Sequence, residues 1–441
     1  MLNKRGRLIT AIVSALLYFL IFYHLKRTES LPLLASFTAL FAGYLYFIYV
    51  RKSFTLGEII TFGLVFRFIS LLAIPSLSDD FYRFIWDGAL WSNKINPFAY
   101  RPEEVFTGNI IPLSDFLNQV YQGLNSRVNY TVYPTIPQLI NVIAYLIGQD
   151  NLLVNVVVQR LFILAAEMLS MYYLIKILQL QKQDRNLLLL YALNPLVILE
   201  LAGNLHHEAL MIAFFLGAVY LGMQKKMIGS GVMLALAIAS KLLPLMFVPL
   251  MILRTKAKIK LIVTLGIAML LLFLPLLDRS FIQGMWSSLT LYYQKFEFNA
   301  GLYYLLREVG FWLYGYNAIA IIGKLLFLLA AILIIIVSFR SSQLKLNTIQ
   351  GAVIIYLIFA LCSLILHPWY ILILVALAPI SRLSFSIPWS YFIFLTYLGY
   401  SATGYEENYW LLGIEYVGLL SALVYDWRQR AFSRATLNEA P

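Results

Sequence analysis

Long apolar stretches recur from one end of the chain to the other, separated by short polar or basic segments. Most are long enough to cross about 30 Å of hydrocarbon as helices, which satisfy their own backbone hydrogen bonds in lipid. The pattern therefore predicts an all-α polytopic membrane protein with about 12–14 transmembrane helices, forming a single transmembrane domain over residues 1–441. The expected spans are 8–24, 31–50, 56–75, 153–178, 187–203, 209–224, 227–253, 259–277, 316–339, 348–366, 369–381, 387–403 and 409–426.

The stretch 227–253 differs from a simple span. Lys241 and Pro244 lie near its middle, and basic residues flank both of its ends, at Lys225 and Arg254. Broken helices with a charge at membrane depth occur where the backbone lines a cavity or is buried in protein. We therefore expect a re-entrant pair of half-helices that returns to the side from which it started.

Two long segments are polar and interrupt the series of spans. Residues 76–150 are expected to form a first external loop with an acidic motif and interfacial helices, and residues 278–315 a second external loop. The apolar part of the first loop, 136–147, is too short to cross the bilayer and is typical of an interfacial helix. Loops held by a rigid scaffold commonly carry chemistry, so we look for function there.

The composition agrees with a membrane protein and excludes a soluble one. Apolar residues make up 61% of the chain and charged residues only 12%, whereas soluble domains carry about 25% charged residues. The net charge of +12 comes from short basic clusters between spans, not from the continuous basic face of a nucleic-acid-binding protein. The positive-inside bias places these clusters, and with them both termini, in the cytoplasm and the two polar loops outside.

The most informative motif runs from Ser78 to Gly88. Ser78 can cap a helix whose first turn contains Asp79 and Asp80, where the helix dipole favours negative charge. On that helix Asp79, Arg83 and Asp87 share one face, while Asp80 points about 100° away. One carboxylate can then be held by Arg83 while its neighbour faces a pocket. The alternative is that both aspartates only cap and solubilise an interfacial helix.

A second polar cluster lies where a span turns back. Asn204, His206, His207 and Glu208 follow Glu200 within nine residues. Such a set can bind a metal, a phosphate or a sugar hydroxyl. It does not form the paired-histidine motif of metalloproteases, but a divalent metal stays among the candidate ligands. The alternative is a set of polar residues that closes a hairpin at the headgroup level.

Lys241 and the run His367-Pro368-Trp369-Tyr370 complete the candidate residues. A lysine at that depth must snorkel, pair or meet an anionic ligand. Trp369 and Tyr370 alone are also typical of the aromatic belt at a membrane interface. Three charged residues inside spans, Arg67, Arg160 and Glu167, are expected to pair with each other and not to take part in chemistry.

Taken together, these motifs resemble those of the GT-C-type integral-membrane glycosyltransferases, in particular the bacterial branch that uses polyprenol-phosphate sugars and is mannosyltransferase-like. In order, the chain contains Ser-Asp-Asp-x-Tyr-Arg-x-x-Trp-Asp-Gly (78–88), Asn96-Pro97, Tyr133-Pro134, Asn194-Pro195-Leu196, Gly203-Asn204-x-His206, Ser240-Lys241-x-x-Pro244 and His367-Pro368-Trp369-Tyr370. The resemblance extends over residues 78–370, and its specificity lies in the ordered series. Departures are Thr135 after Tyr133-Pro134 and His207-Glu208 in place of an Asn-Asp pair.

The resemblance implies a membrane glycosyltransferase that moves a hexose, with mannose as the family's usual sugar. The donor is a polyprenyl-phosphate sugar, and the acceptor is a hydroxyl group of a glycan or lipid-linked glycan. The active site lies on the extracytoplasmic face of the plasma membrane. Asp80 or Asp79 would serve as general base in an inverting transfer, with Asp80 preferred because it can face away from Arg83. The residues expected to bind donor and acceptor are Arg83, Asp87, Tyr133, Asn204, His206, His207, Glu208, Lys241, His367, Trp369 and Tyr370. The alternative, a transporter or flippase for lipid-linked sugars or small solutes, would favour inverted repeats and a site at mid-membrane.

Overall fold

The computed structural model of the chain describes residues 2–438 and consists almost entirely of helices. The predicted domain also includes residues 1 and 439–441, which lie outside the described residues. The first helices are α1 (Leu2–Tyr23), α2 (Ser30–Tyr49), η1 (Arg51–Ser53) and α3 (Leu56–Phe68); the first external segment follows as α4 (Asp80–Ser92), α5 (Pro102–Gly108), α6 (Asp115–Gly123) and α7 (Thr135–Gly148). This part of the chain is helical as the sequence predicts.

The central part of the chain contains the longest helix before the C-terminal one and several broken helices. It comprises α8 (Leu152–Leu180), η2 (Arg185–Leu188), α9 (Leu189–Ala192), α10 (Pro195–Val197), η3 (Ile198–Gly203), α11 (Glu208–Met223), α12 (Met227–Ser240), η4 (Leu243–Phe247), α13 (Val248–Arg254) and α14 (Lys258–Phe273). The C-terminal part comprises α15 (Arg279–Gln294), α16 (Gly301–Tyr314), α17 (Ile319–Arg340), α18 (Thr348–Cys362), η5 (Pro368–Ile371), α19 (Leu372–Ser381), α20 (Ser386–Phe392), η6 (Ile393–Gly399) and α21 (Tyr409–Asn438). Between η6 and α21 the strands β1 (Tyr400–Ser401) and β2 (Gly404–Tyr405) form an antiparallel hairpin.

The all-α polytopic membrane architecture is confirmed. Within residues 2–438, four helices are long and apolar enough to cross a membrane, namely Lys4–Tyr23, Ser30–Tyr49, Leu152–Leu180 and Ile319–Arg340, and six shorter helices are also apolar. Large apolar side chains on the outside of the bundle are exposed, as at Leu16 (65%), Ile259 (78%) and Leu325 (60%). An exposed apolar surface of this kind fits a lipid environment, where it costs no hydrophobic free energy.

The span predicted at 187–203 is bent. Its two halves, Arg185–Ala192 and Pro195–Gly203, meet at 55°. The side chain of Asn194 accepts hydrogen bonds from the backbone amides of Leu196 and Val197, and Pro195 occupies the first turn of the new helix. Asparagine at the cap and proline directly after it start a helix, because both suit backbone positions that lack helical partners. The chain therefore begins a second helix here.

The out-and-back course predicted for 227–253 is also present. Helix α12 ends at Ser240, and Lys241 after it has an extended backbone. The chain returns through η4 and α13 until the Thr255 hydroxyl lies 3.2 Å from the sulfur of Met227, at the start of α12. Both ends of this segment thus lie at the same end of the bundle, and Lys241 is at its tip.

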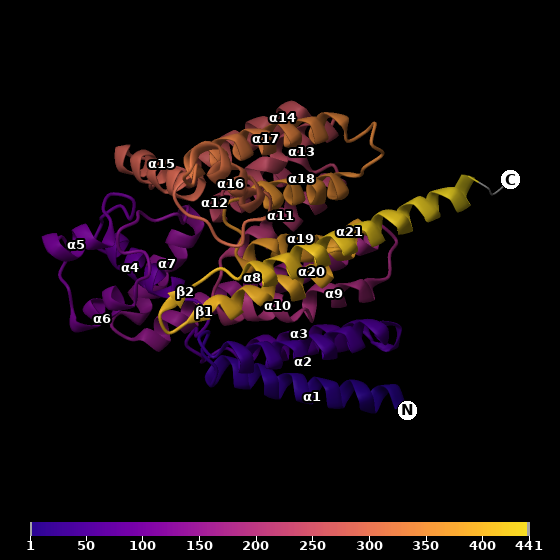
Figure 1. Cartoon of the computed structure of the whole chain (residues 1–441), viewed down its shortest axis with the longest axis horizontal. Coiled ribbons are helices and arrows are strands. Elements are labelled where there is room, and N and C mark those ends of the chain that lie inside the picture. Colours follow the sequence, from indigo (N-terminus) through magenta and orange to yellow (C-terminus); the bar gives the residue numbers. More distant parts are fainter. Residues whose placement is uncertain (1, 439–441) are drawn as a thin grey trace.

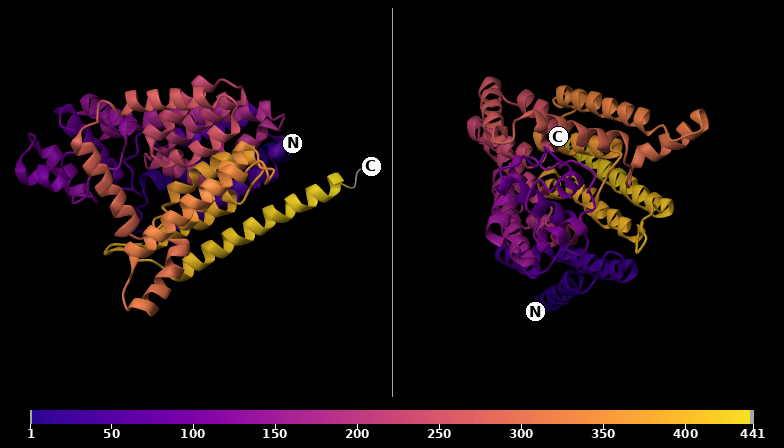
Figure 2. Two further views of the ribbon diagram at one scale, coloured as in Figure 1. Left: turned by 90° about the horizontal axis from the view of Figure 1, so that it is seen from above. Right: turned by 90° about the vertical axis from the view of Figure 1, so that its left-hand side faces the viewer.

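The molecule has two distinct ends. Figure 1 shows the first turns of α1 and the last turns of α21 pointing to one end, while α4–α7 and the β1–β2 hairpin lie at the other. In the right-hand view of Figure 2, which looks onto this second end, α4–α7 gather at the tip of the bundle. We call it the site end, because the candidate residues meet there.

The segment that contains α4–α7 has an apolar cluster of its own. Phe81, Phe84, Ile85 and Trp86 of α4 contribute to it and are almost completely buried. Helices α4 and α7 approach so closely at Gly88 that a Cβ atom there would lie 2.3 Å from the carbonyl oxygen of Asn141. Glycine is therefore required at Gly88 by packing.

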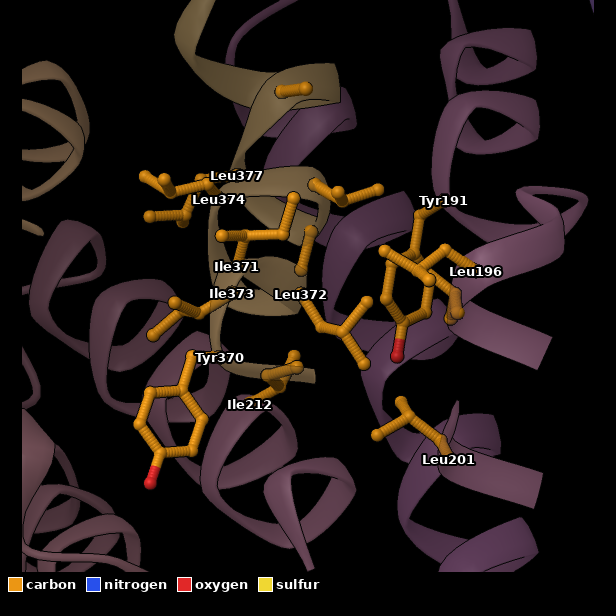
Figure 3. Packing of buried hydrophobic residues seen from close by; sticks show 14 of the residues in the cluster. Tyr191, Leu196, Leu201, Ile212, Tyr370, Ile371, Leu372, Ile373, Leu374 and Leu377 are labelled. Atoms are coloured by element: carbon orange, nitrogen blue, oxygen red, sulfur yellow. The ribbon is translucent and has the colours of Figure 1, made fainter. Parts of the chain in front are cut away.

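Beneath this segment, the main core joins the bent span to α11 and α19. Figure 3 shows Leu372 of α19 pointing toward Tyr191 and Leu201, with Ile212 of α11 nearby. All four side chains are fully buried. This packing fixes the position of the chain before and after the turn at residues 204–207.

Arg67, Arg160 and Glu167 are predicted to pair with each other. The prediction is correct for Arg67 and Glu167 and wrong for Arg160. Arg67 and Glu167 are fully buried and form an ion pair at 2.7 Å. Arg160 instead donates to the carbonyl oxygens of Leu71 (3.0 Å), Ala202 (2.7 Å) and Gly203 (3.1 Å). The carbonyl groups at the end of a helix lack amide donors from the next turn. The guanidinium of Arg160 donates to them instead.

Candidate functional site

The two adjacent aspartates lie at the beginning of α4 and have different partners. Asp79 precedes the helix and pairs with Arg27, which comes from the connection between α1 and α2. Asp80 is the first helical residue, and its backbone amide donates to the Ser78 hydroxyl at 3.3 Å. Arg83 does not hold either carboxylate, because it pairs with Asp87. As expected, one of the two carboxylates is paired with a cation and the other is not. The cation, however, is Arg27 and not Arg83.

Asp80 faces polar groups that carry no fixed positive charge. Its carboxylate accepts from the Tyr133 hydroxyl at 3.2 Å and from the Asn125 amide at 3.5 Å, and it lies 3.9 Å from Nε2 of His206. Its side chain is 22% exposed. Among the side chains that the structure describes, no lysine or arginine forms an ion pair with Asp80. A partly exposed carboxylate of this kind is able to accept a proton from a bound hydroxyl.

Arg83 and Asp87, predicted as binding residues, are buried and hydrogen-bond to each other and to the loop before α7. Their side chains pair at 2.7 Å. Arg83 also donates to the carbonyl oxygen of Asn129, and Asp87 accepts from Thr131 at 2.5 Å and from Gln138 at 2.8 Å. The pair therefore ties the loop before α7 to α4, which places Tyr133 beside Asp80.

The turn at residues 204–207 is shaped by an irregular helix. The six residues before it, Ile198–Gly203, form the π-helix η3, and Leu205 has a positive φ of 64°. Single π-turns are common at functional sites because they redirect side chains at the end of a helix. Here the irregular turn brings Glu200, Asn204 and His206 together, and Arg160 holds its end.

Glu200 lies behind His206 and is completely buried. Its carboxylate accepts from the Tyr397 hydroxyl at 2.7 Å and from the Asn204 amide at 2.9 Å. The same carboxylate lies 3.2 Å from Nδ1 of His206. His206 is thus placed between two carboxylates, those of Glu200 and Asp80.

Aromatic rings form one wall of the site. Trp369 stacks on His206 with the ring centroids 3.9 Å apart and on His367 with the centroids 4.4 Å apart. Tyr400 of the β1–β2 hairpin lies under the guanidinium of Arg27 at 5.1 Å. Aromatic faces at the mouth of a site suit the apolar faces of a sugar ring, and Trp369 is only partly buried.

His207 packs against aromatic side chains, among them Tyr133, whose ring centroid is 5.8 Å away. The His207 ring packs on Phe84, with centroids 4.4 Å apart, and is 3% exposed. Burial, together with the nearby positive charge of Lys241 and the neighbouring His206, lowers the pKa of His207 to about 3. This imidazole is therefore neutral at physiological pH and unsuited to binding an anion by charge.

Lys241 comes from the tip of the re-entrant segment and pairs with Glu208. Its ammonium group also lies 4.0 Å from the centre of the Tyr370 ring. The lysine side chain is 26% exposed, whereas that of Glu208 is 4% exposed. The side chain of Lys241 is therefore partly exposed, while its carboxylate partner is covered.

The tertiary structure gathers nearly all of the predicted residues at one end of the bundle. Sequence reasoning missed Arg27, and did not select Glu200 or include the tyrosines Tyr397 and Tyr400. The signal for Arg27 is its place between two spans on the predicted outer side, where the positive-inside bias disfavours basic residues. Within the part of the chain that the structure describes, no group of three or more histidine, cysteine and acidic side chains is arranged to hold a metal ion.

Comparison with known proteins matches residues 15–257 to the family described as alpha-(1->6)-mannopyranosyltransferase, N-terminal domain. This match covers more than half of the chain. A similar curated protein is alpha-(1->6)-mannopyranosyltransferase A of Mycobacterium tuberculosis, which is 26% identical over 174 residues, or 39% of this chain. The matched part spans 32%, about a third, of that relative's length. No solved structure matches the chain.

Proposed function

Because this chain belongs to the alpha-(1->6)-mannopyranosyltransferase family, we propose that it transfers a mannosyl residue from a polyprenyl-phosphate donor to a hydroxyl group of a glycan acceptor. The acceptor oxygen attacks the anomeric carbon of mannose, and the bond from that carbon to the phosphate oxygen breaks. Direct displacement inverts the configuration of the anomeric carbon. The polyprenyl phosphate leaves as an anion whose tail stays in the bilayer.

The observation that carries this proposal is the environment of Asp80. Its carboxylate is partly exposed at the site end, accepts a hydrogen bond from Tyr133, and has no lysine or arginine partner among the described side chains. General base catalysis needs a group within hydrogen-bond reach of the proton that it removes, and it contributes typically 10²–10⁴-fold to the rate. Asp79 is less suited, because its charge is already balanced by Arg27.

Two cations at the site can stabilise the negative charge of the departing phosphate. Lys241 lies on the side of the re-entrant segment, and Arg27 lies on the side of α1 and α2. A positive charge placed where negative charge develops lowers the barrier to departure of the leaving group. Lys241 is our candidate for this role, since its carboxylate partner Glu208 is buried and its own side chain is partly exposed.

We further propose that the site end faces the extracytoplasmic side of the plasma membrane, with both termini in the cytoplasm. The basic clusters around Lys225 and Arg254 belong to the opposite end, as expected for cytoplasmic connections. The test uses a Cys362→Ser background with Asn109→Cys or Lys225→Cys, both at exposed positions. A membrane-impermeant maleimide added to intact cells should label residue 109 but not residue 225; the reverse pattern contradicts the assignment.

The function itself is tested with purified protein in lipid vesicles or detergent. The protein is incubated with polyprenyl-phosphate mannose carrying radiolabelled sugar and with manno-oligosaccharide acceptors, and the product is analysed for linkage and anomeric configuration. We expect a new α-linked mannose from this donor and none from a nucleotide-linked mannose. Movement of the lipid-linked sugar across vesicles without formation of a glycosidic bond would instead support the transporter alternative.

A further inference from the structure

The contacts of Glu200 mark it as a residue with a task beyond folding. It is fully buried within the π-helix, and two neutral donors, from Tyr397 and Asn204, approach its oxygens. A buried carboxylate is costly unless it is hydrogen-bonded and paired with a positive group. Among the described side chains, the group that forms an ion pair with Glu200 when it is protonated is the imidazole of His206, whose Nδ1 is 3.2 Å away.

The other nitrogen of His206 faces the candidate base. Nε2 lies 3.9 Å from the carboxylate of Asp80, about one ångström beyond a hydrogen bond. Trp369 stacks on the imidazole and limits its rotation, and neither ring nitrogen has a hydrogen-bond partner among the described residues. The His206 imidazole therefore lies between buried Glu200 and partly exposed Asp80, with one nitrogen near each carboxylate.

We propose that Glu200 is a positioning residue that orients His206 to take the proton from Asp80, a role that rests on the proposed function. A carboxylate beside Nδ1 keeps the proton of the neutral imidazole on that nitrogen and leaves the lone pair of Nε2 toward Asp80. The acceptor hydroxyl gives its proton to Asp80 as its oxygen bonds to the anomeric carbon. Asp80 passes the proton to Nε2, and the imidazolium, stabilised by Glu200, releases it to water.

The charges around His206 favour this exchange. The carboxylates of Glu200 and Asp80 lie near its two nitrogens, while Lys241, paired with Glu208, lies on the side of the re-entrant segment. The neighbouring imidazoles of His207 and His367 are neutral because burial lowers the pKa of each to about 3, and the Arg27–Asp79 pair balances itself. Glu200 is thus a charge beside His206 that can be removed without altering the base, Asp80.

The test is the pH dependence of transfer by Glu200→Gln, which keeps the shape of the side chain and removes its charge. Loss of the charge beside Nδ1 removes the group that stabilises the imidazolium in the proposed relay. We expect kcat to fall about tenfold with little change in either KM, and the acidic limb of the kcat/KM profile to move about one pH unit lower. In His206→Gln the limb due to the imidazole should be absent, and kcat should fall about 100-fold.

Glu415→Gln is the matched control. Glu415 is also buried and also accepts from two neutral donors, Trp389 and Asn299, but it contacts neither His206 nor Asp80. The pH profile of kcat/KM in Glu415→Gln should keep the acidic limb of the wild type. An unchanged limb in Glu200→Gln, with an unchanged melting temperature, overturns the positioning role. Should that variant not fold, Tyr397→Phe, which removes one donor to Glu200, must lower kcat without raising KM, and an unchanged kcat overturns the role.

Failure of the relay is distinguishable from failure of the proposed function. Transfer that depends on Asp80 but is indifferent to Glu200 leaves the mannosyltransferase in place and removes only the relay. Absence of any glycosidic product with the wild-type protein removes both.

Discussion

The guanidinium of Arg27 pairs with the carboxylate of Asp79, a residue 52 positions later in the chain. This contact brings the connection between α1 and α2 against the start of α4. It also neutralises one of two adjacent carboxylates, which would otherwise repel each other. The neighbouring Asp80 is thereby left as the negative charge that faces the site.

This pairing predicts different results for the two aspartates. In Asp80→Asn, loss of the base should lower kcat by about 10²–10⁴-fold, with a melting temperature close to that of the wild type. In Asp79→Asn the loss of activity should be smaller and the melting temperature lower, because Arg27 loses its partner. Asp115→Asn, at an exposed acidic residue of the same segment, is the control. Full activity in Asp80→Asn would remove the proposed base.

Lys241 is expected to act on the donor. In Lys241→Ala the positive charge near the departing phosphate is lost, and Glu208 is left buried without its partner. We predict a rise of about tenfold or more in the KM for the polyprenyl-phosphate donor, with a smaller change for the acceptor. Steady-state kinetics with each substrate varied in turn measures this, and Lys295→Ala, at an exposed lysine, serves as control. Equal changes in both KM values would argue against contact with the phosphate.

The contact between α4 and α7 predicts that Gly88 does not tolerate a side chain. In Gly88→Ala the new methyl group meets the backbone carbonyl of Asn141 at 2.3 Å, and backbone atoms cannot move aside cheaply. We expect a loss of about 1–3 kcal/mol in unfolding free energy, read as a lower melting temperature in detergent. Gly413→Ala is the control, since nothing lies within 4 Å of its Cβ. Equal melting temperatures would contradict the close packing.

His207 gives a pH dependence of stability. Its pKa is about 3 in the folded state because burial disfavours the charged form, and about 6.5 in an unfolded chain. Below pH 6.5 the unfolded state therefore binds a proton that the folded state does not, and stability falls with pH until about pH 3. Between pH 7 and pH 5 this amounts to about 2 kcal/mol.

The measurement compares melting temperatures at pH 7 and pH 5. The decrease should be smaller in His207→Gln than in the wild type, because the titrating group is gone. His24→Gln, at an exposed histidine, should behave as the wild type does. An equal decrease in all three proteins would place the source of any acid sensitivity elsewhere.

Composition and the length of the apolar stretches by themselves determined that the chain is an all-α membrane protein, because lipid leaves a polypeptide few other ways to satisfy its backbone. The position of Lys241 and Pro244 within a flanked apolar stretch was enough to predict the out-and-back course of α12 and α13. The acidic motif and the turn at 204–207 were recognisable because charged side chains are rare among so many apolar ones.

Only the tertiary structure decided the partners of those charges. Arg27 binds Asp79, Arg83 binds Asp87, and Glu200 reaches His206 through a π-turn, none of which follows from spacing along the chain. Local periodicity specifies the face of a helix on which a side chain lies, whereas an ion pair depends on which helices pack together and at what height. For the same reason Arg160, expected to pair with a carboxylate, instead holds the carbonyl groups where a helix bends.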